Sequence, residues 1–148
     1  MPFRFPLQSI LNFRQSIEHQ QELRLRAANQ QVARVRHLVE QIDARRQELH
    51  AAQSRELGTG LTSAELRFEL QCDEELLRHR RELESHLVRL QQLRDQQREI
   101  FQQARRMRET LEAVRDQQLD SYKQEAARNE QRTLDDLFLL RRAYFRRG

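Results

Sequence analysis

Five histidines and one cysteine are the side chains in this sequence best suited to hold a transition metal. A di-iron site in a helical bundle uses a Glu three residues before each ligand His. The residues three positions before the five histidines are instead Ser16, Arg34, Gln47, Leu76 and Leu83. Cys72 and His79 could share a helix face, but two ligands do not complete a tetrahedral zinc site. The pattern therefore predicts no metal site and no cofactor.

Neighbouring carboxylates are the other candidates for chemistry, at Asp73-Glu74-Glu75 and at Asp135-Asp136. Acid–base catalysis needs a water-excluded cleft that shifts their pKa values, and a solvated helix surface provides none. The three glycines form neither G-x-x-x-x-G-K-[ST] nor G-x-G-x-x-G, so no phosphate-binding loop is expected. We therefore predict that the protein is not an enzyme and acts by binding other proteins.

The composition favours long helices over a compact globule. Charged residues make up 34% and the hydrophobic class 37% of the 148 residues, and the mean hydropathy is -0.96. The dominant residues are Leu, Arg, Gln, Glu and Ala, which are strong helix formers. Only two prolines and three glycines are available to interrupt a helix. This combination predicts an all-α fold held together by a narrow apolar seam.

The charges are mixed along the chain rather than gathered. Although the formal net charge is +4, the 23 acidic residues lie among the 27 basic ones, as on a salt-bridged helix surface. A nucleic-acid site would need basic residues concentrated on one face, so no nucleic-acid partner is expected. Arg141-Arg142 and Arg146-Arg147 could touch an anion, but they equally suit the last turns of a helix, where positive charge complements the helix dipole.

The helix-breaking residues divide the chain in two. Pro6 is tolerated in a first helical turn, and no further breaker occurs before Gly58. A first helix is therefore predicted over residues 6–57 and a turn over residues 58–62. The expected fold is a single coiled-coil domain over residues 1–148, built as an antiparallel two-helix hairpin with a longer second helix.

The second helix is predicted over residues 63–143 because a helix-start signal precedes it. Thr62 and Glu65 have the spacing of a capping box, in which each side chain bonds the backbone N–H of the other. Leu61 and Leu66 can pack as a hydrophobic staple around this cap. The turn, the cap and the staple agree on a chain reversal.

Apolar residues repeat in both helices as in a coiled coil. In the first helix the seam predicted from steps of three and four is Leu25, Ala28, Val32, Val35, Val39, Ile42 and Leu49, preceded by a stutter through Ile10, Phe13, Ile17 and Gln21. The second helix repeats Leu76, Leu83, Leu90, Gln97, Ala104 and Leu111, with Leu93, Ile100, Met107 and Val114 as the expected companion series. Arg46 and Asp73 fall at seam positions almost equidistant from the turn, so we expect them to meet.

The two predicted arms are unequal in length. Folding back about the turn places Pro6 beside about Ala113, so the chain beyond about Arg115 is expected to lack an intramolecular partner. That tail nevertheless carries Leu119, Tyr122, Leu134, Leu137, Phe138, Leu139, Leu140, Tyr144 and Phe145. An apolar helix face without a partner marks an interaction surface, although a frayed terminal segment is the alternative.

Features that the sequence lacks indicate where in the cell the protein is expected. The single Cys72 allows no intrachain disulfide, which fits a reducing compartment. The N-terminus has no long apolar region typical of a signal peptide, and no window approaches a membrane span. We expect a cytoplasmic protein that does not insert into the membrane directly.

Each end of the chain carries a motif that resembles those of a known family. The opening Phe3-Arg4-Phe5-Pro6-Leu7-x-x-Ile10-Leu11-x-x-Arg14 is similar to the start of the FliJ family of flagellar type III export proteins. Tyr122 and Glu130-Gln131-Arg132-Thr133-Leu134-Asp135-Asp136 resemble its C-terminal E-Q-x-x-L-D-E segment, with Asp136 where Glu is commoner. The Gly58-Thr59-Gly60 turn also falls where the family reverses, so the resemblance covers essentially the whole chain.

The resemblance implies a non-enzymatic stalk of the export apparatus in flagellum biogenesis and motility. Its expected partners are the hexameric flagellar export ATPase FliI, the cytoplasmic part of the export gate protein FlhA, and export chaperones that it helps to recycle. The protein would then be cytoplasmic and peripherally associated with the cytoplasmic face of the cell membrane through this apparatus.

Two sets of residues are predicted to bind these partners. The ATPase-facing set is Phe3, Phe5, Arg14, Glu130, Gln131, Leu134, Asp135 and Asp136. The gate-facing set on the hairpin is Leu38, Ile42, Leu49, Leu76 and Leu83, although four of these five are also seam positions whose periodicity is explained equally by packing.

Other classes remain open from sequence. A virulence-type secretion system uses stalks of the same architecture. A generic coiled-coil scaffold would form stable dimers, whereas an intramolecular hairpin is expected to be a monomer. A nucleic-acid binder would show steeply salt-dependent affinity.

Overall fold

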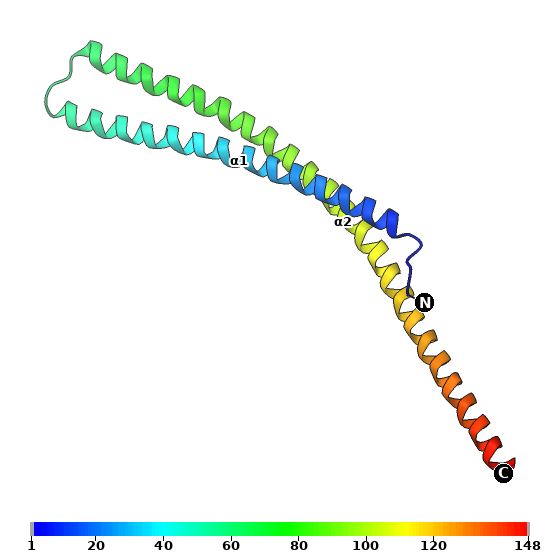
Figure 1. The fold of residues 1–148 in the computed structure, drawn as a ribbon. Coiled ribbons are helices and arrows are strands. Elements are labelled where there is room, and N and C mark those ends of the chain that lie inside the picture. The colour runs from blue at the N-terminus through cyan, green and yellow to red at the C-terminus, as the bar shows by residue number, and fades with distance from the viewer. Residues whose placement is uncertain (1, 148) are drawn as a thin grey trace. The chain divides into compact units, whose positions relative to one another are not determined.

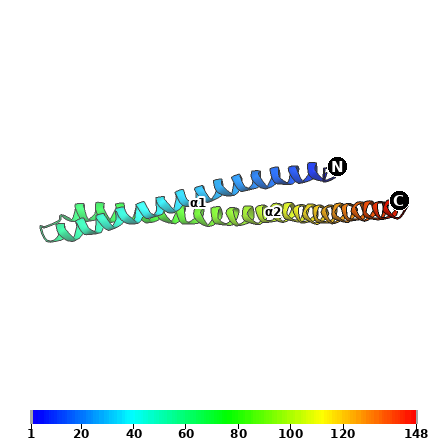
Figure 2. The same cartoon turned by 60° about the horizontal axis from the view of Figure 1, so that its bottom comes forward.

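The computed structural model describes residues 2–147, and in that range the fold is all-α. Helix α1 spans Gln8–Leu57 and helix α2 spans Ser63–Arg147, with 50 and 85 residues respectively. The two helices are joined by one turn and run antiparallel on either side of it (Figures 1 and 2). The predicted fold class, an antiparallel hairpin with a longer second helix, is confirmed.

The turn has the chemistry that the sequence indicates. Gly60 adopts a φ of 92°, a left-handed conformation that glycine tolerates without steric cost. The backbone N of Thr62 donates to Glu65 Oε2, and the backbone N of Glu65 donates to Thr62 Oγ1, both at 3.3 Å. The predicted capping box is therefore present, and α2 begins at the predicted residue.

The outer helix ends differ slightly from the prediction. Helix α1 begins two residues later than expected, because Pro6 lies in a turn in which the Gln8 N–H donates to the Phe5 carbonyl at 3.1 Å. Helix α2 continues four residues beyond 143, since no breaker occurs before Gly148.

The chain forms two compact units, each containing a piece of both helices. One unit contains residues 19–102 and the other contains residues up to 18 together with those from 103 onward. We call them the hairpin unit and the terminal unit. That the chain behaves as one domain stays a prediction.

The hairpin unit has a narrow core flanked by ion pairs. Val32, Val35 and Ile42 are buried, as their seam positions predict. The Arg46 Nε donates to Asp73 Oδ1 at 2.9 Å, which confirms the predicted contact across the seam. The Arg80 Nε donates to Asp43 Oδ1 at 2.7 Å.

The register of the hairpin unit is set by these polar contacts and by a third one. Gln97 Nε2 donates to the side-chain oxygen of Gln21 at 2.6 Å. As the α1 partner moves from residue 46 to 43 and 21, the α2 partner moves from 73 to 80 and 97. The pairing is therefore antiparallel throughout the unit.

The terminal unit corrects the predicted stutter in α1. Ile10 and Phe13 are 45% and 62% exposed, whereas Leu11 is completely buried. The packing face runs from Leu11 through Arg14 and Glu18, which continue the steps of three and four without interruption. The apolar pattern predicted the wrong face of α1 here because the polar side chains of Arg14 and Glu18 occupy packing positions.

Three of the four members of the companion series predicted in α2 were wrong for the same reason, whereas Val114 is half-buried as expected. Leu93, Ile100 and Met107 are 58%, 47% and 49% exposed. The half-buried positions instead are Arg80, Leu87, Arg94, Phe101 and Arg108, which repeat every seven residues. Arginine stems can cover apolar surface, and the guanidinium groups of Arg80 and Arg108 reach Asp43 and Glu18 on the opposite helix. The guanidinium of Arg94 instead bonds Asp95 on its own helix.

Candidate binding surfaces

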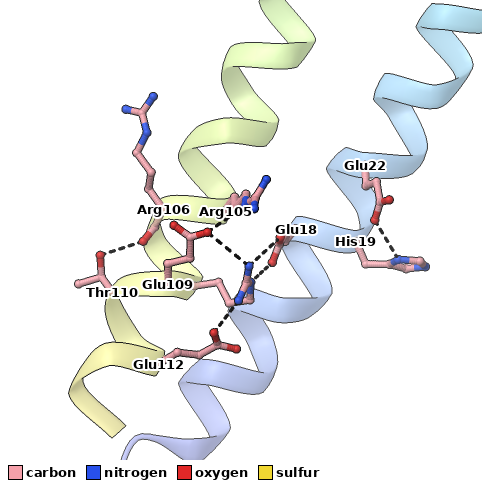
Figure 3. A network of polar contacts seen from close by, with 9 residues as sticks. Glu18, His19, Glu22, Arg105, Arg106, Glu109, Thr110 and Glu112 are labelled. Atoms are coloured by element: carbon pink, nitrogen blue, oxygen red, sulfur yellow. Dashed lines mark hydrogen bonds and ion pairs between the residues drawn. The ribbon is translucent and has the colours of Figure 1, made fainter. Parts of the chain in front are cut away.

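A charged cluster lies inside the terminal unit where α1 and α2 pack. Arg108 donates to both carboxylate oxygens of Glu18, and its Nη1 donates to Glu112 Oε2 at 2.6 Å. Figure 3 shows Glu18 on α1 and Glu112 on α2 pointing toward the same guanidinium. The hydrogen bond to Glu18 raises the pKa of Arg108 further above its usual high value. This cluster is a structural contact between the helices, in which two carboxylates share one guanidinium.

The N-terminal residues 2–7 extend the packing further along α2 than predicted. The rings of Phe3 and Tyr122 lie 5.6 Å apart at 49°, and Phe5 is buried. The expected end of pairing, near Ala113 to Arg115, is therefore about seven residues short. The reason is that a non-helical backbone can advance by about 3.3 Å per residue, against about 1.5 Å in a helix.

An open groove of about 570 Å³ accompanies this contact. It is lined by Pro2, Phe3, Arg4, Val114, Gln117, Gln118, Ser121, Tyr122 and Glu125. Its lining mixes a cation, a carboxylate, amides and two aromatic rings, which suits a protein side chain better than a reacting substrate.

The predicted ATPase-facing residues fall into two groups within the terminal unit. Phe3, Phe5 and Arg14 belong to the packed part, where Arg14 Nη1 donates to Met107 Sδ at 3.2 Å. The other five residues, Glu130, Gln131, Leu134, Asp135 and Asp136, are all exposed on α2. Gln131 Nε2 donates to Asp135 Oδ1 at 3.1 Å along that helix.

The predicted gate-facing residues are mostly engaged in packing. Ile42 is buried, and Leu49, Leu76 and Leu83 are half-buried in the hairpin unit. Leu38 is the member of the set with an exposed side chain. Any partner on this face would therefore meet Leu38 more directly than the other four.

The C-terminal segment, defined here as residues 123–147, is helical and exposed at every residue. Its large apolar side chains are Leu134, Leu137, Phe138, Leu139, Leu140, Tyr144 and Phe145. Within residues 2–147, no ion pair involves a residue of this segment, although the rest of α2 is rich in them. Both its apolar and its charged groups are thus available to another molecule.

Glu56 and Glu69 form a carboxylate pair near the turn that the sequence did not predict. Hydrogen bonding to Glu56 raises the pKa of Glu69, and loss of solvation adds to the effect. The two residues lie on opposite sides of the turn at unequal distances from it, so their positions in the sequence did not indicate that they would meet.

No grouping of three or more His, Cys, Asp or Glu side chains in the described residues could hold a metal ion. Neither described helix contains a stretch apolar enough and long enough to cross a membrane.

The fold and its ion-paired seam define the class of this protein as an antiparallel helical hairpin of the coiled-coil type. Residues 3–148 match the family model described as Flagellar FliJ protein. The chain belongs to this family and is therefore a flagellar, export-related protein. Neither the curated proteins nor the solved structures contain a match to it.

Proposed function

We propose that the protein is a non-enzymatic stalk and regulatory subunit of the flagellar type III export apparatus. Its partners would be the hexameric export ATPase FliI, the cytoplasmic part of the export gate protein FlhA, and export chaperones whose recycling it assists. It would act in the cytoplasm, peripherally at the cytoplasmic face of the cell membrane, through these partners.

The observation that carries the proposal is the C-terminal segment in a member of the FliJ family. A helix that exposes seven large apolar side chains, and whose charged groups form no ion pair among the described residues, has unused binding capacity. Five of the predicted ATPase-facing residues lie on it. A single helix is also slim, about 10–12 Å across with its side chains, which suits the centre of a ring.

The mechanism follows from symmetry. A ring of identical subunits has equivalent sites, whereas one helix presents different side chains in different directions. Binding such a helix makes the ring subunits inequivalent and favours those conformations that contact it best. The effect on hydrolysis depends on the difference in affinity for the ring's states, and tight binding without such a difference would change nothing.

The test is ATP hydrolysis by the purified ring with and without this chain. The proposal expects faster hydrolysis with the chain present and none from the chain alone. Leu134→Ser should reduce the stimulation, because Leu134 belongs to the predicted ATPase-facing set. Leu93→Ser is a matched control, since Leu93 and Leu134 are 58% and 60% exposed. No stimulation by the wild-type chain would refute the regulatory role.

Binding to the export gate is tested separately on the hairpin unit. Leu38→Ser should weaken binding to the cytoplasmic part of FlhA, because Leu38 is the exposed member of the predicted gate-facing set. Leu23→Ser is the control, being another exposed leucine of α1 in the same unit. Equal affinities for the two variants would argue against this face as the gate site.

A further inference from the structure

We propose that the C-terminal segment pairs antiparallel with the same segment of a second copy of this chain. The basis is an uneven charge distribution along an apolar, exposed helix. Residues 130–136 contain three acids and one arginine, whereas residues 137–147 contain four arginines and no acid. The inference does not rest on the proposed function, although both assign a role to Leu134 and Asp135.

Charge selects the direction of this pairing. A parallel arrangement would set the arginine-rich ends of the two copies against each other. An antiparallel arrangement centred between Phe138 and Leu139 sets Asp135 opposite Arg142. A two-fold axis forms this contact twice, as in any interface between identical surfaces.

The face that would meet the second copy has coiled-coil spacing. Leu134, Phe138, Arg141 and Phe145 follow steps of four, three and four, so they share one side of the helix. Phe138, Arg141, Arg142, Phe145 and Arg146 line a common groove of about 470 Å³ on this side. In the antiparallel pair, Leu134 lies near Phe145 of the second copy, and Arg141 lies near the ring of Phe138, where cation–π attraction is available.

Asp135 and Arg142 flank this apolar face on its same side. They are seven residues apart, two helical turns, and Phe138 lies between them. Both are exposed, and neither forms an ion pair with another described residue. Each can therefore reach the opposite charge on the second copy without breaking an existing intramolecular ion pair.

The rest of the chain leaves room for this contact. The N-terminal residues reach α2 no further than the groove that ends at Glu125, whereas the overlap covers residues 130–147. This overlap is about 27 Å long at ~1.5 Å per residue, which is short for an interface of the standard ~800 Å² per partner. Pairing should therefore be reversible, with monomers at low concentration.

Sedimentation equilibrium over a range of concentrations tests the inference on the full chain. The wild-type mass should rise from 18.0 kDa toward about twice that value. Asp135→Arg alone or Arg142→Asp alone should weaken dimerisation by roughly tenfold or more, because each sets like charges together twice. Asp120→Arg should have no such effect, since this exposed acid lies outside the segment. Circular dichroism verifies that every variant keeps its helices.

The decisive measurement uses the two single variants together. One carries two positive groups at these positions and the other carries two negative groups, so an equimolar mixture should form heterodimers as strong as the wild-type dimer. The double variant Asp135→Arg with Arg142→Asp should dimerise again by itself. A wild-type chain that stays at 18.0 kDa at all concentrations, or single variants that dimerise like the wild type, would overturn the inference.

Discussion

The hairpin unit and the C-terminal segment use the same residue types in opposite ways. In the hairpin unit, arginines and acids occupy the packing positions and bond across the helices, as Arg46 does to Asp73 and Arg80 does to Asp43. In the C-terminal segment, arginines and acids are abundant, but no ion pair forms among the described residues, and large apolar side chains are exposed. Polar pairing thus specifies register where a partner helix is present. Where no partner helix is present, the charged and apolar side chains remain available to bind another molecule.

The largest expected effect distinguishes a packed position from an exposed one. Leu11→Ala should lower the free energy of unfolding by about 2–4 kcal/mol, because Leu11 is completely buried. Ile10→Ala should cost less than about 1 kcal/mol, and Leu140→Ala in the C-terminal segment should change stability by less than about 0.5 kcal/mol. Urea denaturation followed by circular dichroism measures all three. If Leu11→Ala and Ile10→Ala lowered the free energy of unfolding equally, the predicted stutter through Ile10 would be supported after all.

The next effect concerns the polar contact at the seam. Asp73→Ala should cost about 1–3 kcal/mol, because it leaves the part-buried guanidinium of Arg46 with one fewer partner. Replacing both residues by leucine should recover much of this loss, since an apolar pair needs no charge compensation. A double-mutant cycle on the free energy of unfolding provides the measurement. Strictly additive single effects would show that the two side chains do not interact.

A smaller effect is expected at the turn that brings the helices together. Gly60→Ala should destabilise the chain by about 1 kcal/mol, because a Cβ is disfavoured at a φ of 92° even though the space around it is open. Gly58→Ala is the control, since its Cβ would meet the Arg55 carbonyl at an ordinary 3.5 Å. Thermal unfolding compares the two. If Gly58→Ala were the more harmful, the strain argument would be wrong.

The smallest effect is a difference in pH dependence. The hydrogen bond from Arg46 holds the pKa of Asp73 below its usual value, so its stabilisation is present above the unfolded pKa and is lost as the pH falls through the folded one. The raised pKa of Glu69 acts in the opposite sense, since its contribution is present in acid and is lost as the pH rises through the folded pKa. Glu69→Gln should therefore flatten the loss on the alkaline side.

Urea midpoints measured from acidic to neutral pH separate these two contributions. Asp73→Asn should remove part of the acid loss and leave the contribution of Glu69 in place. If Glu69→Gln left the whole curve unchanged, the contact between Glu56 and Glu69 would have no energetic consequence.

The hairpin fold could be predicted from local sequence signals, but the register between the two helices could be predicted only in part. Breakers and the Thr62–Glu65 cap located the turn, and the heptad of Leu76, Leu83 and Leu90 located one packing series. The companion positions escaped because hydrophobicity alone favours Ile100 over Arg108. Predicting Arg108 as a packing position requires knowing that Glu18 lies opposite it on α1. That knowledge concerns the pairing of the two helices and is not contained in the sequence pattern of either helix alone.

The candidate sites were harder to predict for a related reason. Apolar spacing does not distinguish a side chain that packs internally, such as Ile42, from one that remains available, such as Leu38. The limit of the free segment was also misplaced, because its position depends on the non-helical path of residues 2–7. The periodicity of apolar residues determines neither the exposure of a given side chain nor the path of the N-terminal residues.

The contact between Phe3 and Tyr122 has a practical consequence for watching this protein at work. The sequence contains no tryptophan and only two tyrosines, Tyr122 and Tyr144. Tyr122 is half-buried beside Phe3 and Tyr144 is largely exposed, so near-ultraviolet spectroscopy has a distinct native chromophore in each place. Detachment of the N-terminal residues from α2 would alter the spectroscopic signal of Tyr122 while leaving the helical content almost constant. Binding of another molecule to the C-terminal segment would alter the signal of Tyr144.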